Sequence, residues 1–318
     1  MISRRLLRIK VAKTIYGHLQ TPDRTLAQSE KELLHSIKKF NDLYHLFLSL
    51  IVEVADYSQS RMDIGKQKHI PTAAEKDPNT RFVNNAVVDM LRNNEALGVY
   101  IHSNKLSWVN YPEMVKKFFV NMSTKEYFQN YLNSDTCDFK ADKQLVVNFL
   151  TNEVEDFDDL YSCLEEQSIF WMDEIEFVLG MVIKTVKGFK EEKGGKCELM
   201  PLYKESEDED FATRLLRRAV IKRSEYLDLI GLHSSNWDVE RIAFMDTVIM
   251  LTAISEIAEF PNIPIKVSFN EYIDLAKLFS TPNSASFING VLDKIINQMK
   301  NENKIVKSGK GLVGEDAV

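Results

Sequence analysis

An internal repeat constrains the fold of this chain more than any other feature of its sequence. When Trp108, Trp171 and Trp237 are aligned without gaps, apolar residues coincide on both sides of them. The coinciding sets are Phe82/Leu145/Phe211, Val87/Leu150/Leu216, Leu91/Val154/Val220, Leu97/Leu160/Tyr226, Ile101/Leu164/Ile230, Val115/Val178/Phe244 and Phe119/Val182/Val248. Each copy is therefore predicted to contain a helix, a short bend, a second helix, a polar loop and a helix opened by Trp. Chance agreement among amphipathic helices is the alternative interpretation.

The three tryptophans are predicted to be buried anchors of the core rather than platforms for nucleobases, because large aromatic side chains are mostly buried. Gly and Pro are scarce, with 12 and 8 in 318 residues, and no stretch alternates with the period of two that a half-buried strand requires. These features favour an all-α fold. Helices are expected at 4–19 and 33–57, with a loop or linker at 61–80, which contains Pro71 and Pro78.

Several features of the sequence limit the classes of protein to which the chain can belong. Cys137, Cys163 and Cys197 are far apart and odd in number, which argues against a disulfide framework and a zinc site. No apolar run has the length of about 18 residues that spans a bilayer, and the charged N-terminus lacks the apolar core of a signal peptide. The expectation is a cytoplasmic protein with no membrane association.

Charge is distributed unevenly along the chain. The formal net charge is −7, yet residues 1–20 carry basic residues without an acidic one, while acidic residues concentrate at 153–166 and 205–210. The basic residues of the first segment are Arg4, Arg5, Arg8, Lys10 and Lys13. An acidic body with one basic end can dock an anion locally and repel it elsewhere. Nonspecific affinity for RNA is therefore expected to be modest.

Motifs for catalysis are few. The chain has no Walker lysine motif, no HExxH and no GxSxG. One GxGxxG, at 309–314, follows no predicted strand and is interpreted as a chance match. The six His are scattered, and the acidic run at 156–159 lacks the Gly of a calcium loop. We expect a protein that is not an enzyme and holds no metal and no cofactor.

Two segments at opposite ends of the chain resemble the NusB family of transcription antitermination factors. The first is residues 4–16, where clustered arginines precede a closing Ile15-Tyr16 pair. The second is more specific and contains, in the family's order, Pro264, Lys266-Val267, Asn270-Glu271, Ala276-Lys277, Phe279 and Phe287-Ile-Asn-Gly-Val-Leu-Asp293. The resemblance covers roughly 1–20 and 207–298. It departs from the family pattern at Leu251 and Ser255, where Arg and Tyr are common.

The resemblance implies an all-α, NusB-like helical bundle, here enlarged by an inserted array of helical hairpins. The NusB-like domain would comprise 1–24 and 207–300, the inserted helical domain of uncertain role 25–206, and a disordered tail 301–318. The insertion follows from length, because the family's usual chain is less than half as long. Extra copies of the family's own helical pair, as the tryptophan repeat suggests, would account for it.

The resemblance also implies a function. Proteins similar to this one bind single-stranded boxA-type RNA of the ribosomal RNA leader together with the ribosomal protein NusE, within the transcribing RNA polymerase complex. On this interpretation Arg4, Arg5 and Arg8 contact phosphates, Lys277 and Ser284 lie in the RNA site, and Phe287 stacks on a base. The residues matching the partner side are Tyr16, Glu240 and Asp246.

Simpler roles for these residues stay open: a solvated helix end for the arginines, and a core position for Phe287. Two other functions also stay open. A helical protein-interaction scaffold without RNA binding is one, although the clustered basic helix argues against it. The targeting module of an RNA methyltransferase is the other, and because this chain has no domain for a methyl donor, it would need a second chain.

Overall fold

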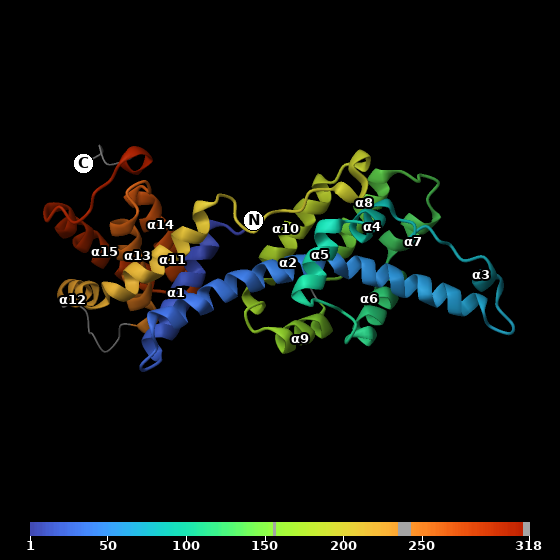
Figure 1. The fold of residues 1–318 in the computed structure, drawn as a ribbon, viewed down its shortest axis with the longest axis horizontal. Coiled ribbons are helices and arrows are strands. Elements are labelled where there is room, and N and C mark those ends of the chain that lie inside the picture. Colours follow the sequence, from blue (N-terminus) through green and yellow to red (C-terminus); the bar gives the residue numbers. More distant parts are fainter. Residues whose placement is uncertain (155–156, 235–242, 314–318) are drawn as a thin grey trace. The chain divides into compact units, whose positions relative to one another are not determined.

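The computed structural model describes residues 1–154, 157–234 and 243–313. Within these ranges the regular elements are all helices, and the single β-type pairing is an isolated bridge between Ile2 and Tyr203. The all-α prediction is confirmed. By contacts, the chain divides into two compact units, one of Met1 and Lys38–Leu202 and one of Ile2–Ile37 and Tyr203–Val318. Figure 1 shows the course of the helices in both.

The second unit is a bundle built around one buried helix. Its elements are α1 (Arg4–Gln20), the first turns of α2 (Leu26–Lys66), α11 (Glu207–Ile221), α12 (Arg223–His233), α13 (Phe244–Glu259), α14 (Ile265–Phe279), α15 (Ser284–Asn301) and a 3-10 turn, η4 (Gly309–Leu312). Helix α13 is buried at every position from Val248 to Ile257 and contacts α1, α11, α12, α14 and α15. A helix that is apolar all round belongs at the centre of a bundle.

The first unit contains the rest of α2 and the shorter helices. These are α3 (Ala73–Lys76), α4 (Ala86–Arg92), α5 (Glu95–Asn104), α6 (Pro112–Thr124), α7 (Glu126–Asn133), α8 (Phe139–Asn152), α9 (Asp158–Gln167), η1 (Met172–Glu174), α10 (Ile175–Gly188) and η2 (Glu191–Lys196). Side-chain caps fix several of their starts: Asn85, Asn94 and Asp138 each accept from backbone N–H groups in the first turn.

The predicted repeat appears as a recurring order of helices. The series α4–α5–α6 is followed by α8–α9–α10, and α5 and α9 have 10 residues each. Trp108 and Trp171 each lie in the turn ahead of the third helix and are 1% exposed. Both indole N–H groups donate to carbonyls of α2, Trp108 to Leu46 at 3.1 Å and Trp171 to Lys39 at 2.7 Å. The prediction of buried anchors is confirmed for these two, whereas Trp237 lies outside the described residues.

The chain differs from the prediction at α2. This helix has 41 residues, so it continues beyond both ends of the expected 33–57 and takes in part of the expected linker. The predicted domain boundary at 24 and the contact-based division after Ile37 therefore differ, and the latter falls inside a continuous helix.

The segment after α15 corrects a second expectation. The predicted disordered tail is ordered in part, because residues 307–311 pack on the turn at 260–262. Residues 314–318 lie outside the described residues. Lys307 Nζ donates to the carbonyls of Ile257 and Phe260 at 2.8 and 2.9 Å, and Ser308 N donates to that of Pro261 at 3.0 Å. A Cβ on Gly311 would lie 1.9 Å from the Pro261 oxygen, so only glycine fits there.

Candidate functional site

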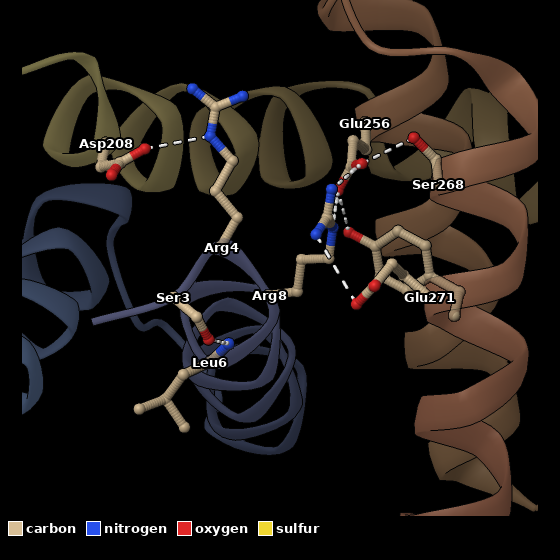
Figure 2. Close-up of polar contacts among 9 residues, drawn as sticks. Ser3, Arg4, Leu6, Arg8, Asp208, Glu256, Ser268 and Glu271 are labelled. Atoms are coloured by element: carbon tan, nitrogen blue, oxygen red, sulfur yellow. Dashed lines mark hydrogen bonds and ion pairs between the residues drawn. The ribbon is translucent and has the colours of Figure 1, made fainter. Parts of the chain in front are cut away.

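A buried ionic network joins α1 to α13 and α14 (Figure 2). Arg8 donates through Nε and Nη2 to the two carboxylate oxygens of Glu256, at 2.7 and 2.8 Å. Ser268 Oγ and Tyr272 Oη donate to the same carboxylate at 2.6 and 2.8 Å, and Glu271 lies 3.7 Å from Arg8 Nη1. A buried charge pair is tolerated when its geometry is good and its lone pairs are satisfied, as they are for Glu256. Glu271 Oε2, by contrast, is buried without a hydrogen bond.

The network also affects ionisation. Burial alone would lower the pKa of Arg8, but the Glu256 carboxylate raises it above its ordinary value. Burial, together with the Glu256 charge, raises the pKa of Tyr272 well above its usual range. Arg8 is 4% exposed, so the phosphate contact predicted for it would require this network to open. In the closed network, Arg8 fixes the position of α1.

The other predicted cations of this unit are accessible. Arg4 is partly exposed and its Nε lies 3.0 Å from Asp208 Oδ1, on α11. Arg5 and Lys277 are exposed and both contact Asp274, Arg5 Nη2 at 3.4 Å and Lys277 Nζ at 3.0 Å. The shared carboxylate places a cation of α1 beside a cation of α14. Each of these surface pairs contributes little stability, so both cations are available to a ligand.

Three more predicted site residues are buried at the turn between α14 and α15. Ser284 Oγ donates to Asp246 Oδ2 at 2.8 Å, and Ser280 Oγ donates to the other oxygen of Asp246. Asp246 and Ser284 are 3% and 2% exposed, and Phe287 is 6% exposed. Asp246 thus holds the turn at 281–283 in place. Stacking of Phe287 on a base would require its ring to leave the core.

The same unit also exposes three aromatic side chains, which are Tyr16, Phe244 and Phe279. Tyr16 and Phe244, both partly exposed, pack edge to face with ring centroids 5.0 Å apart. Phe279 is also exposed, and Lys13 Nζ lies 5.4 Å from its ring centroid. Glu240, the third predicted partner residue, lies outside the described residues.

Sequence reasoning assigned no role to Phe279, Phe244 or Lys13. For Lys13, the sequence does contain a pattern that could have indicated its place in the site. On α1, Arg5, Lys13 and Tyr16 recur at helical spacing on the exposed face. Together, the exposed side chains Arg5, Lys13, Lys277 and Phe279 form what we call the α1–α14 surface. It combines three cations with one aromatic ring, which suits a flexible polyanion with planar bases.

Other kinds of site find no support in the described ranges. No group of three or more His, Cys, Asp and Glu side chains there is arranged to hold a metal ion. Within the same residues, the helices are too short or too polar to cross a membrane.

Comparison with known proteins gives consistent results for the C-terminal half. Residues 184–297 match the model of the NusB family. A transcription antitermination protein NusB of Salinibacter ruber is 36% identical over 119 residues, which cover 37% of this chain and 74% of that protein. The protein of the same name from Desulforapulum autotrophicum is 38% identical over 122 residues, covering 36% of this chain and 85% of that protein.

A third relative with this name, from Chloroherpeton thalassium, is 39% identical over 105 residues, covering 33% of this chain and 49% of that protein. No solved structure matches the chain. The matched stretch begins inside α10 and ends inside α15, so it includes all or most of every α-helix of the second unit except α1 and α2.

Proposed function

The chain belongs to the NusB family, and on this premise we propose that it is a transcription antitermination factor that binds single-stranded boxA-type RNA together with the ribosomal protein NusE. The observation that carries the proposal is the α1–α14 surface. In a chain of net charge −7, it gathers exposed cations beside an exposed ring. Recognition is the whole of the proposed mechanism.

The roles in RNA binding divide between exposed and buried residues. Arg5, Lys13 and Lys277 contact successive phosphates, which fixes the register of the strand without reading its sequence. Phe279 offers the exposed ring on which a base stacks. Arg4 orients the start of α1 through Asp208, and the phosphate contact predicted for it stays a prediction.

The buried members of the predicted site support this surface from beneath. Arg8 fixes α1 against α13 and α14. Ser284 holds the turn after α14, and Phe287 is buried in the first turn of α15. Direct contact of these three with RNA stays a prediction.

NusE would dock on the exposed aromatic pair, Tyr16 and Phe244. Aromatic side chains, Tyr among them, are enriched at protein interfaces and among the residues that contribute most of the binding free energy. Asp246 acts there by holding the neighbouring turn, and Glu240 stays a predicted contact.

The test is the salt dependence of RNA affinity, measured by fluorescence anisotropy with a boxA-like oligonucleotide. Three neutralised phosphates predict a slope of log affinity against log salt of roughly −2, at about 0.7 per contact for single strands. The variant R5Q/K13Q/K277Q should flatten this slope and weaken every RNA alike. Phe279→Ala should cost about 1–3 kcal/mol of binding, because it removes one stacked base.

The control variant K31Q/K294Q/K310Q removes the same charge from exposed lysines outside α1 and α14. It should bind RNA with nearly the wild-type slope. If the two triple variants behave alike, the α1–α14 surface is not the RNA site. Binding of NusE without any RNA binding would instead favour the scaffold function.

A further inference from the structure

A second candidate site lies in the first unit, at the end of α10. A cavity of about 600 Å³ opens there between α10 and the segment that follows it. Its lining includes Lys184, Phe189, Lys190, Lys193, Leu199 and Met200. The volume is in the range of sites that hold small molecules or parts of larger ligands.

The walls of this cavity are fixed by buried side chains. Tyr44 Oη shares a hydrogen bond of 2.8 Å with Thr185 Oγ1 and accepts from Met200 N at 3.0 Å, which ties α10 to the far wall. Asn94 Nδ2 donates to the carbonyls of Gly195 and Cys197, at 3.1 and 2.8 Å, and so fastens the loop containing η2. The cavity is thus formed before any ligand arrives, so little ordering free energy opposes binding.

A third anchor adds charge. Lys143 Nζ, from α8, donates to the carbonyls of Lys187 and Phe189, at 3.2 and 2.6 Å. These carbonyls belong to the C-terminal end of α10, where a cation is favourable. Lys143 therefore both fixes the turn and brings a positive charge behind the wall formed by Phe189.

The rim of the cavity is basic and lacks counterions. Lys184, Lys190 and Lys193 are exposed, and no carboxylate oxygen of the described residues lies within 4.0 Å of their Nζ atoms. Elsewhere in this unit Arg92, Lys116 and Lys117 do contact carboxylates.

Acidic residues are present in the same segment but do not neutralise the rim. Of Glu191, Glu192 and Glu198, only Glu198 lines the cavity. The lining therefore carries three Lys against one Glu, in a chain whose overall charge is negative. A fixed cavity with unneutralised ammonium groups has a positive potential that attracts an anion.

We propose that this cavity is a second RNA contact, in which Lys184, Lys190 and Lys193 bind successive phosphates of a single strand and the apolar wall receives a base. This inference rests on the proposed function, because it assumes that the chain binds RNA. It gives the inserted helices a role that the α1–α14 surface does not fill.

Two features favour a strand over a free phosphate or nucleotide. The lysines of the lining are joined in the same segment by two more exposed lysines, Lys187 and Lys196, so that five exposed lysines recur at intervals of three residues from 184 to 196. Several cations along one segment suit a chain of phosphates better than a single phosphate. The wall of Leu199 and Met200 beside buried Phe189 is apolar, which suits the face of a base rather than a solvated anion.

Amine footprinting of the wild-type chain gives the first test. With a labelled single-stranded RNA of about 20 nucleotides, acetylation of Lys184, Lys190 and Lys193, followed by mass spectrometry, should decrease several-fold. Acetylation of Lys66, Lys76 and Lys125, exposed lysines of the same unit outside the cavity, should be unchanged. Equal protection by uridine monophosphate alone would overturn the proposal in favour of a nucleotide pocket.

Salt titration of RNA affinity gives the second test. With the RNA of about 20 nucleotides, contacts at the cavity add to those at the α1–α14 surface and predict a slope of log affinity against log salt of roughly −4. The variant K184Q/K190Q/K193Q should bring this slope to roughly −2, since three contacts are lost. The matched variant K66Q/K76Q/K125Q should leave it unchanged, and circular dichroism should show that both retain their helices. A cavity variant that binds like its matched control overturns this inference.

The two proposals fail in different ways. If the cavity variant behaves like its control while R5Q/K13Q/K277Q loses affinity, the second contact is absent and the α1–α14 surface stands. If the cavity variant loses affinity and R5Q/K13Q/K277Q does not, the α1–α14 surface fails and the cavity stands. No RNA binding by the wild-type chain would overturn both.

Discussion

At the scale of single residues, the N-terminal arginines show what a sequence can and cannot reveal. Their clustering predicts a basic helix, and Arg5 is exposed on it. Arg8 pairs with Glu256, which is 248 positions away and carries no mark of that pairing in the sequence. The helical period separates Arg8 from Arg5 by less than one turn, so a small rotation of α1 decides which of them reaches solvent.

The Arg8–Glu256 pair predicts a large effect on stability. Replacing Glu256 by Gln removes the negative charge that compensates Arg8 and weakens the hydrogen bonds from Ser268 and Tyr272. Loss of one partner of a buried pair costs about 3–5 kcal/mol. Urea denaturation followed by circular dichroism should show this loss in Glu256→Gln.

Asp274→Asn is the matched control, because it breaks the exposed contacts of Arg5 and Lys277. It should change the free energy of unfolding by no more than about 1 kcal/mol. Similar stabilities of the two variants would mean that the buried network does not hold the bundle together.

At the scale of elements, the helices and their repeat are readable where apolar residues recur. The expected order of helices around Trp108 and Trp171 is present because buried faces leave a periodic pattern. The C-terminal turns of α2 were missed, since Arg61 and Lys66 are exposed there and leave no apolar stripe. The segment at 307–311 was missed because Lys307 and Gly311 bond or pack against backbone, which composition does not show.

Equivalent anchors should respond alike to the same substitution. Trp108→Phe and Trp171→Phe each remove an indole donor from a carbonyl of α2 and leave a small void. Each should cost about 1–3 kcal/mol, the range for a buried group left unsatisfied. Hydrogen–deuterium exchange of α2 read by mass spectrometry should accelerate in both, and a change in only one would contradict the equivalence.

At the scale of the whole molecule, the buried His45 and the half-buried His18 make stability depend on pH. Burial lowers the pKa of His45 from 6.5, although the Asn41 carbonyl and Asp42 oppose this. Burial, then Arg223 and Arg24, lowers the pKa of His18 as well. The unfolded chain therefore binds more protons than the folded one just below pH 6.5. Stability present above this pH is lost as pH falls toward the lower folded values.

Thermal unfolding at a series of pH values from about 7.5 to 5.5 checks this. The melting temperature should decrease on acidification, and the decrease should be smaller in His45→Phe. That variant keeps a ring to stack on Tyr100, whose centroid is 3.7 Å from that of His45, but it cannot take up a proton. A melting temperature that rises on acidification would contradict the assignment.

The two tryptophan anchors also show how the number of helical hairpins in such a chain depends on the length of α2. Their acceptors on α2, Lys39 and Leu46, are seven positions apart, which is two helical turns on one face, or about 10 Å. A further copy of the hairpin anchored in the same way would need a further acceptor carbonyl at the next interval. The next intervals, at positions 32 and 53, still lie inside α2 (Leu26–Lys66), so the length of this helix sets how many anchors of this kind it can offer.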